Sequence, residues 1–467
     1  MTSKQVLRNI SSAFLVTGLI FFAAPASPGM PGLDLPHAEK KNLQNGIPVV
    51  YVYDDLPQTT IIASIGYGKL HEDRNTAGLS ALLSEMIKLS GSRKYPGKSL
   101  HDAVESMGGR LSVETSWEST VISLKVLSRF SGRAFDILSD LVTNPNFNSS
   151  DIERARFIVI DEVRRKFDDP AAIAFEKARE IIFNGKGYGS VPTEKGVASY
   201  TIDNCVRAWK EYFTTGNMLL GINSSKSFNE MFDMAASVFS SVRQGTRKDY
   251  AVSPAEVAAS LEKNRDLIFL YPKDIPQATI VFGTGAPAIA ESGTYALSLM
   301  NFILGGGSFN SRLMYEIRVK RGLAYAVQSV VRFRYRTGVF LAFAQTENSS
   351  VAEVFNLMND NIAAMSSSPV KDSELAWAKK SLQNSYVFNF DTSLNVLGNY
   401  LEREYNRLPD DYHERYIDNV MKVSAQDIES ECSRMLKPGM VRVVVGDKGL
   451  AGSLSSAGRV VVLDREE

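Results

Sequence analysis

Residues 57–62 read PQTTII and residues 276–281 read PQATIV, so one short stretch recurs at an offset of 219 residues (276 − 57). Each copy leads into a glycine-containing strand end, and a long helical pattern follows each strand. A second landmark, a glycine turn into a strand, recurs as TTGNMLLGI at Gly216 and KPGMVRVVVGD at Gly439, at an offset of 223 residues (439 − 216). Two landmarks in the same order with nearly equal offsets indicate an internal duplication.

The duplication divides the chain into two halves of similar size. We expect a first domain over residues 43–242, a second over residues 267–467, and a polar linker without a sustained apolar period over residues 243–266. In each half, stretches rich in β-branched residues come as adjacent hairpin-like pairs, and helical patterns surround them. The sequence therefore predicts an α+β fold, with a mainly antiparallel or mixed sheet in each half and helices packed on it.

Local signals predict the elements around the candidate chemistry. In the first half we expect a helix from residue 77 and, further along the chain, a helix that begins with a capping box, Ser150-x-x-Glu153, and stops before Pro170. The second half repeats the scheme with a helix, a glycine-rich loop, a second helix and a hairpin, over residues 294–304, 305–310, 311–321 and 323–346.

The N-terminal stretch has the layout of a secretory signal peptide. Lys4 and Arg8 precede an uncharged apolar run at residues 13–24, and Ala-Pro-Ala at residues 24–26 provides a small-x-small cleavage site. The run is short for a membrane span, which needs about 20 residues, so an uncleaved anchor is the alternative.

We therefore expect a signal peptide at residues 1–26 and a flexible lead-in at residues 27–42. The mature chain should be exported, to the periplasm if the source is a Gram-negative bacterium, and should not engage the membrane after cleavage. Lysine plus arginine number 52 and aspartate plus glutamate number 52, so there is no global field to attract nucleic acid.

The histidines do not form a metal-binding pattern. The chain has four of them, His37, His71, His101 and His413. HEDRN at His71 begins like the zinc motif His-Glu-x-x-His, but Asn75 stands where the second imidazole should be, in a stretch rich in turn formers. The other three are isolated, so we interpret all four as solvent-facing or hydrogen-bonded structural residues.

Several longer stretches carry a family resemblance. They are NGIPVVYV from residue 45, GYGKLHEDRNTAGLSALLSEM from residue 66, MGGRLSVETSWEST from residue 107, LVTNPNFNSSDIERARFIVIDEVRRKFDDP from residue 141 and LGGGSFNSRLMYEIRVKRGLAYAV from residue 304. The chain resembles the pitrilysin/insulinase family of zinc peptidases, and most of all the branch with mitochondrial processing peptidase and short bacterial peptidases. The resemblance covers nearly all of the mature chain and implies two halves in a clam-like arrangement.

The resemblance also locates a metal site, which is degenerate here. In active members the helix after AG(L) carries His-x-x-Glu-His, whose imidazoles hold zinc while the glutamate activates the bound water. The two histidines fall on Ala81 and Glu85, the catalytic glutamate on Ser84, and a third ligand on Glu162. The resemblance therefore implies that this chain binds no cofactor. The alternatives are a hard cation held by Glu85 and Glu162, or an ordinary helix carboxylate at Glu162.

The second half keeps a different part of the family pattern. In two-chain bacterial members, one subunit carries the metal motif and the other completes the site with an Arg/Tyr pair in the R-x-K-R-G-L-A-Y region. Here that pair is Arg318 and Tyr325. Arg321 lies close by in the sequence and should not be mistaken for Arg318. A tyrosine hydroxyl can donate a hydrogen bond to a developing oxyanion, and an arginine can hold a carbonyl or carboxylate. Without the resemblance, we would interpret Arg318 as a helix-surface charge and Tyr325 as a core strand residue.

Gly305, Gly306 and Gly307 come before a helix and could cradle a phosphate, but the Gly-Lys-Ser/Thr ending of a P-loop is missing. The resemblance instead implies a flexible loop at the entrance to a peptide chamber, with a substrate-contact or gating role.

Together these features favour a non-catalytic subunit of an exported two-chain zinc metallopeptidase, inactive alone. A homologous partner with His-x-x-Glu-His would hold the zinc, and this chain would supply Arg318, Tyr325 and half of a chamber for a peptide or unfolded protein. Two other hypotheses remain: a scaffold protein of the same fold with no peptidase role, and a self-sufficient metallopeptidase that uses Glu85 and Glu162.

Overall fold

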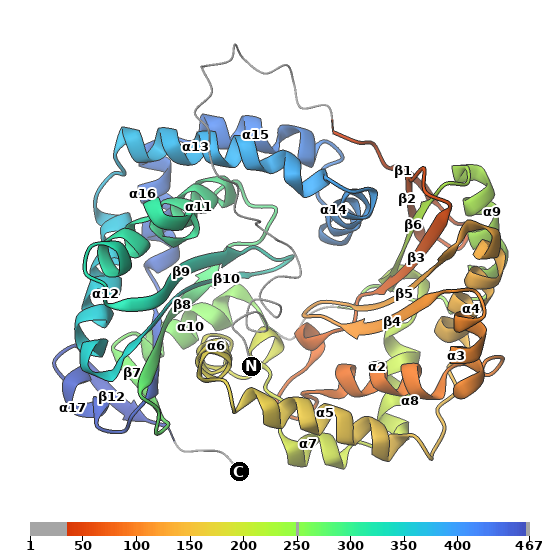
Figure 1. Ribbon diagram of the computed structural model, residues 1–467, viewed down its shortest axis with the longest axis horizontal. Helices are drawn as coiled ribbons and strands as arrows, with labels where there is room; N and C mark the ends of the chain where they lie inside the picture. Colours follow the sequence, from red (N-terminus) through yellow and green to blue (C-terminus); the bar gives the residue numbers. More distant parts are fainter. Residues whose placement is uncertain (1–34, 249–251, 464–467) are drawn as a thin grey trace.

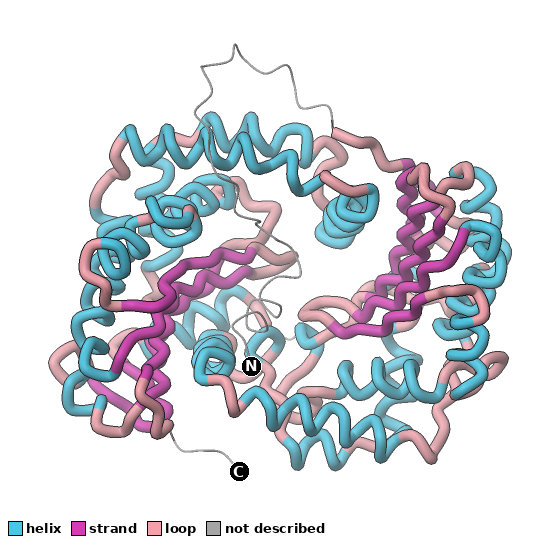
Figure 2. The backbone as a smooth tube through the Cα atoms, in the orientation of Figure 1, coloured by secondary structure: helices cyan, strands magenta, loops and turns pink. Residues whose placement is uncertain are grey.

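A computed structural model describes residues 35–248 and 252–463. Their strands form two six-stranded sheets, one in each half of the chain, and helices surround both sheets (Figures 1 and 2). The predicted α+β class, with one mixed sheet in each half, is confirmed. The expected signal peptide at residues 1–26 lies outside the described residues.

The first sheet has the strand order β1-β2-β6-β3-β5-β4. Strands β2 and β6 pair in parallel, and the other neighbours pair antiparallel. Its strands are β1 (Glu39–Asn42), β2 (Pro48–Tyr53), β3 (Gln58–Ile65), β4 (Arg110–Thr115), β5 (Thr120–Leu127) and β6 (Met218–Ser224).

The second sheet has the order β12-β7-β11-β8-β10-β9. Strand β7 pairs in parallel with β11 and β12, and the remaining pairs are antiparallel. Its strands are β7 (Leu267–Pro272), β8 (Gln277–Ala286), β9 (Ala324–Arg332), β10 (Gly338–Glu347), β11 (Val441–Gly446) and β12 (Arg459–Val462).

The two sheets repeat one topology, in agreement with the duplication read from the sequence. Strand β3 begins at Gln58 and β8 at Gln277, the second residue of each repeated hexapeptide. In each sheet this strand has two neighbours. One is a strand of the hairpin, β5 or β10, and the other, β6 or β11, also pairs in parallel with β2 or β7. The sheets differ at one outer strand, because β1 precedes β2 in the chain whereas β12 comes from the C-terminal end.

Helices fill both faces of each sheet. Those between the first strand and the second sheet are α2 (Leu79–Ser90), α3 (Lys98–Glu105), α4 (Ser131–Thr143), α5 (Ile152–Lys166), α6 (Pro170–Ile182), α7 (Glu194–Ser199), α8 (Ile202–Tyr212), α9 (Phe228–Phe239) and α10 (Pro254–Asn264). Those of the second half are α11 (Thr294–Asn301), α12 (Val351–Ser367), α13 (Asp372–Tyr386), α14 (Ser393–Asn406), α15 (Tyr412–Lys422), α16 (Ala425–Leu436) and α17 (Leu450–Leu454).

Each half covers one face of the other half's sheet. Helix α6, from the first half, packs on β8 and β11 of the second sheet, and α14, from the second half, packs on β2 and β6 of the first sheet. Figure 1 shows both helices between the two sheets. The halves therefore share two apolar cores, and separating them would expose both.

Two glycines allow this close approach. A Cβ atom on Gly221 of β6 would lie 2.7 Å from Leu401 of α14. A Cβ atom on Gly283 of β8 would lie 2.9 Å from Ile182 of α6. A side chain at either strand position would push the exchanged helix away from the sheet.

The tips of two hairpins tie the halves further. Glu118, in the β4–β5 turn, accepts a hydrogen bond from the Tyr188 hydroxyl at 2.5 Å and pairs with Arg334 of the β9–β10 turn at 3.3 Å. The Tyr405 hydroxyl, from α14, donates to the Glu118 carbonyl at 3.1 Å.

The structure differs from three local expectations. Residues 254–264 of the expected linker form α10, which buries Val257 and Leu261 against the second half. Residues 35–42 of the expected lead-in are ordered, because Leu35 is only 4 % exposed and β1 pairs with β2. Helix α10 does carry a local signal, because Ser253 and Glu256 form a capping box and Pro254 stands in its first turn, whereas the order of residues 35–42 depends on tertiary contacts.

The third difference is the start of α5. Its N-cap is Asp151 rather than Ser150, and no capping box forms. The Asp151 carboxylate accepts from the Ser90 hydroxyl at 2.8 Å, at the end of α2, while Glu153 pairs with Arg156.

Among the described residues, no helix has the length and apolar character that crossing a bilayer requires.

Candidate functional site

Helix α2 is held in place by an apolar face and by a buried carboxylate at its start. Leu82, Leu83 and Met86 are fully buried in the first core. The Glu72 carboxylate accepts from the backbone N–H groups of Gly78 and Ser80 at 2.9 and 2.8 Å, which satisfies donors that a helix start leaves free. A negative charge there also complements the helix dipole.

The positions expected to be degenerate on this helix serve packing. Ala81 carries no donor atom. Ser84 is 3 % exposed, and its hydroxyl lies 2.5 Å from the hydroxyl of Thr115 on β4. Thr115 donates in turn to the Ser80 carbonyl at 3.0 Å, so the Ser84 hydroxyl is the donor to Thr115. This chain of hydrogen bonds fastens α2 to β4.

The two carboxylates of the alternative metal hypothesis have different surroundings. Glu85 pairs with Lys88 at 3.3 Å through one oxygen, and its other oxygen is buried and has no hydrogen-bond partner among the described residues. Glu162 is exposed on α5. No group of three His, Cys, Asp or Glu side chains in residues 35–248 and 252–463 could hold a metal. With Ala81 inert and the Ser84 hydroxyl engaged, this donor set does not fit zinc.

The histidines lie apart from that helix face. Burial lowers the pKa of His71 to about 4, and its ring Nδ1 accepts from the Gly68 N–H at 3.4 Å. Burial also lowers the pKa of His413, whose Nε2 lies 3.2 Å from the Asn399 carbonyl. His37 and His101 are exposed.

The glycine segment is more structured than the sequence suggested. Gly305 and Gly306 end η5 (Phe302–Gly306), a π-helical continuation of α11, so the expectation of a loop is wrong for them. A Cβ on Gly305 would lie 2.5 Å from the Ser329 nitrogen on β9, and a Cβ on Gly307 would lie 2.5 Å from Trp377. These glycines are needed for close packing. The backbone flexibility of glycine, considered alone, does not reveal this role.

Arg318 is exposed, and no carboxylate of the described residues pairs with it. It lies on η7 (Met314–Val319), a second π-helical segment, and π-turns often occur at functional sites. Within the described part of the chain its side chain has one recorded contact, the Phe309 ring at 6.0 Å. The neighbouring Arg321 instead pairs with Glu316 at 2.5 Å, so the two arginines are not equivalent.

Tyr325 is the second residue of β9, the outer strand of the second sheet, and is 64 % exposed. The interpretation of Tyr325 as a core strand residue, made without the resemblance, is therefore wrong. Its hydroxyl has no hydrogen-bond partner in the described residues. A tight turn with Gly322 at a φ of +68° connects η7 to β9, which places Arg318 and Tyr325 on adjoining elements.

The sequence reading missed one residue of this region. Phe309 is 62 % exposed and lies beside Arg318, although a large aromatic side chain normally leaves water. The sequence does contain a signal for this exposure. Phe309 stands among Gly, Ser and Asn, so it belongs to no apolar face of a helix or strand that could bury it.

The structure thus separates the predicted residues into two places. The glycine segment, Phe309, Arg318 and Tyr325 gather around the outer strand β9 of the second half. Ala81, Ser84 and Glu85 lie on α2 and Glu162 on α5, in the first half (Figure 1).

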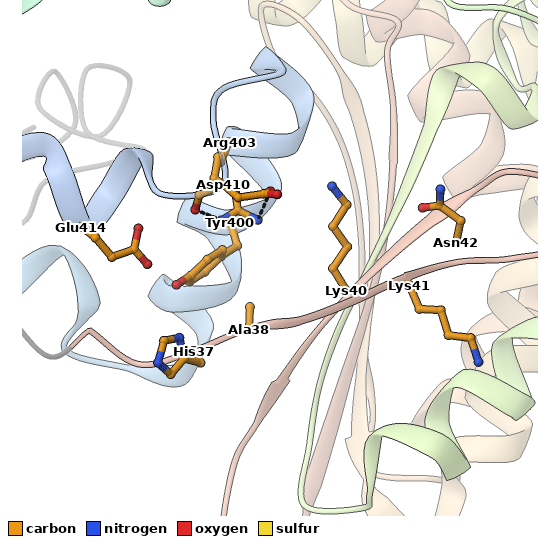
Figure 3. A pocket seen from close by; sticks show the side chains of 9 residues that line it. All are labelled: His37, Ala38, Lys40, Lys41, Asn42, Tyr400, Arg403, Asp410 and Glu414. Carbon is orange, nitrogen blue, oxygen red and sulfur yellow. Dashed lines mark hydrogen bonds and ion pairs between the residues drawn. The ribbon is translucent and has the colours of Figure 1, made fainter.

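A surface cavity of about 530 Å³ lies elsewhere, between the chain before β1 and the helices α14 and α15. Figure 3 shows the Lys40 side chain on one side of it and Arg403, bonded to Asp410, on the other. Lys40 pairs with Glu404 at 2.5 Å, and the Arg403 guanidinium donates to the Asp410 carbonyl at 2.6 Å. None of the predicted site residues lines this cavity.

Comparison with known proteins gives matches along most of the chain. Residues 49–191 match the family Insulinase (Peptidase family M16), and residues 199–382 match the Peptidase M16 inactive domain. An uncharacterised zinc protease of Rickettsia bellii is 24 % identical over 426 residues, which cover 88 % of this chain and 98 % of that protein. The uncharacterised zinc protease YmxG of Bacillus subtilis is 22 % identical over 355 residues, 75 % of this chain and 84 % of that protein.

Solved structures share the fold. A peptidase M16 inactive domain from Pseudomonas fluorescens superimposes with a TM-score of 0.79 at 21 % identity, covering 88 % of this chain and 98 % of that one. A protease from Helicobacter pylori superimposes with a TM-score of 0.76 at 17 % identity, covering 88 % of this chain and 100 % of that one.

Proposed function

Because the chain belongs to peptidase family M16, the insulinase family, we propose that it is the non-catalytic subunit of an exported two-chain zinc metallopeptidase. A homologous partner carries His-x-x-Glu-His and holds the zinc. This chain contributes Arg318, Tyr325 and half of the chamber that receives a peptide or unfolded protein. The description of its relatives as zinc proteases supports a role in proteolysis.

One observation carries the proposal: Arg318 and Tyr325 are exposed on adjoining elements, and neither has a polar partner in the described residues. Groups that stabilise a fold are normally paired. An unpartnered hydroxyl can donate to the oxyanion that forms when water attacks a peptide carbonyl, and a free guanidinium can hold a neighbouring carbonyl or carboxylate. Both roles need a substrate presented from outside this chain.

The first half supports the same division of labour. Ala81 offers no ligand, and the Ser84 hydroxyl is committed to Thr115, so neither side chain can replace an imidazole or a general base. The zinc therefore belongs to the partner in this proposal. Export follows from the signal-peptide pattern of residues 1–26, and in a Gram-negative source it would be to the periplasm.

Mixing the two chains tests the proposal. The chain is purified alone and then titrated into a homologous His-x-x-Glu-His chain from the same genome, while cleavage of a quenched fluorescent peptide is followed. We expect no cleavage by this chain alone and an activity that saturates at one copy per partner. Arg318→Ala should lower the activity of the complex by roughly 100-fold, whereas Arg321→Ala, in the same turn, serves as the matched control.

The rival hypotheses predict different results. A scaffold protein would give no gain in cleavage, or a gain that Arg318→Ala leaves intact. A self-sufficient metallopeptidase would cleave peptides alone and would contain stoichiometric metal after purification. Either result would overturn the proposal.

A further inference from the structure

Two cations stack on one indole ring where the two halves meet. Trp117 lies in the turn between β4 and β5. The Lys69 ammonium, in η1 (Lys69–His71), and the Arg179 guanidinium, on α6, each lie 4.7 Å from the centroid of its ring. Strand β3 ends just before Lys69, α6 packs on the second sheet, and Trp117 packs against the core that α6 shares with that sheet, so the cluster lies where the two halves meet. Figure 1 shows α6 between the two sheets.

The cluster has more positive than negative charge. Lys166 adds a third cation and pairs with Glu176 at 3.5 Å, which leaves one carboxylate for three cations. Glu72 is near, but its carboxylate is engaged with the start of α2. Within residues 35–248 and 252–463, neither Lys69 nor Arg179 forms an ion pair or a side-chain hydrogen bond.

Such an arrangement is costly without an anion. Burial lowers the pKa of Lys69 to about 8, with a further contribution from Lys166, and burial lowers the pKa of Arg179 to about 10. An indole face attracts cations, but it does not neutralise them. Lys69 and Arg179 are each half-buried, and charges removed from water are normally paired, so an anionic group that reaches both cations would stabilise this site.

We propose that Lys69 and Arg179, held on Trp117, form a binding site for a peptide carboxylate. The carboxylate is either the free C-terminus of the peptide or an acidic side chain, since both present the same two oxygens to the cations. That the ligand is a peptide rests on the proposed function, and Lys69, Trp117 and Arg179 are each half-buried, so a ligand from outside the chain can reach them. None of the residues named for the Arg318 and Tyr325 site belongs to this cluster.

The test measures peptide affinity directly. Three short fluorescein-labelled peptides share one sequence: a neutral form with an amidated C-terminus, a form with a free C-terminal carboxylate, and an amidated form with one internal aspartate. Binding to the full mature chain is measured by fluorescence anisotropy at pH 7. We expect at least one carboxylate peptide to bind about tenfold more tightly than the neutral form. The form that gains identifies the source of the carboxylate.

Variants then assign the preference. Lys69→Met and Arg179→Met should each remove most of it while the affinity for the neutral peptide stays unchanged. Lys98→Met is the matched control, because Lys98 is exposed on α3 and pairs with Asp102 at 2.8 Å. The comparison of the three peptides on the unaltered chain stays decisive even if a variant fails to fold.

Three results would overturn the inference: equal affinity for the three peptides, a preference that survives both variants, or no peptide binding by the chain. Equal binding of all three peptides would leave the proposed subunit role standing. Failure of the mixing experiment with the zinc-bearing partner would instead remove that role, whatever the outcome for the carboxylate peptides.

Discussion

The α2–β4 region of the first half and the stretch from α11 to β9 of the second half, which includes η5 and η7, occupy corresponding places in two sheets of one topology, yet they treat polar groups differently. Around α2, the Ser84 hydroxyl and the Glu72 carboxylate are buried and bonded within the chain. Around β9, Arg318 and Tyr325 are exposed and lack polar partners among the described residues. In a duplicated architecture, polar groups that have hydrogen-bond partners inside the chain support the fold. Polar groups without such partners remain available for chemistry.

The backbone shows the same contrast. Helix α2 is a regular α-helix from Leu79 to Ser90, whereas the corresponding stretch of the second half changes from α11 into the π-helical η5, and η7 is π-helical too. Wider turns sacrifice hydrogen-bond geometry and usually persist where function requires them.

Removing a core side chain from α2 should have the largest effect on stability. Leu83 is fully buried, so Leu83→Ala should lower the free energy of unfolding by about 2–5 kcal/mol through lost burial and a residual cavity. Urea denaturation measures it. Leu127→Ala, on the exposed end of β5, is the matched control, and an equally small effect of both changes would contradict the packing role of α2.

Acid should weaken the first half through His71. Its pKa is lowered by burial to about 4 in the folded chain, against about 6.5 when unfolded, so the unfolded chain binds more protons between these values. His71 should therefore make its full contribution to the free energy of unfolding above about pH 6.5. The free energy of unfolding should fall by up to about 3 kcal/mol as the pH drops to about 4. His413, whose pKa is also lowered, contributes in the same direction.

Urea denaturation at a series of pH values measures this dependence. His71→Phe should flatten the curve between pH 6.5 and 4, and His101→Phe, on the exposed face of α3, provides the control. An unchanged slope in His71→Phe would show that other groups cause the acid sensitivity.

The hydrogen bond between α2 and β4 should have a smaller effect. Ser84→Ala removes one buried hydrogen bond and should lower the free energy of unfolding by about 1 kcal/mol. The activity of the complex with the zinc-bearing partner should be unchanged, because Ser84 faces Thr115. A loss of turnover without a loss of stability would restore a chemical role to this helix.

The smallest effect on stability is expected around β9. Arg318→Ala should change the free energy of unfolding by no more than about 0.5 kcal/mol, because this exposed group makes no ion pair within the described chain. Thermal denaturation measures it. A much larger loss would mean that Arg318 supports the fold, which would undo the contrast between the two regions.

The sequence predicts the shared architecture well because the duplication is written in local patterns. The recurring PQ hexapeptides mark β3 and β8, which occupy the same place in the two sheets. Alternating apolar residues likewise indicate the β4–β5 and β9–β10 hairpins, since a strand with one buried face repeats every two residues.

Features that depend on distant contacts are not visible in the sequence. The exchange of α6 and α14 between the halves requires Gly221 and Gly283 to face another half's helix, and neither glycine is unusual in its own strand. Asp151, not Ser150, is the N-cap of α5, and its carboxylate accepts a hydrogen bond from Ser90, which is far away in the sequence. The Lys69, Trp117 and Arg179 cluster likewise joins three separate elements.

Turnover by the complex with Tyr325→Phe tests the central claim most directly. The change removes one hydroxyl, and Tyr315→Phe, an equally conservative change at a half-exposed tyrosine on η7, is its control. We predict that Tyr325→Phe lowers kcat of the partner-bound enzyme by roughly 100-fold, as expected for loss of an oxyanion donor, while Tyr315→Phe leaves it within about twofold. Equal turnover of the two variants would contradict the account.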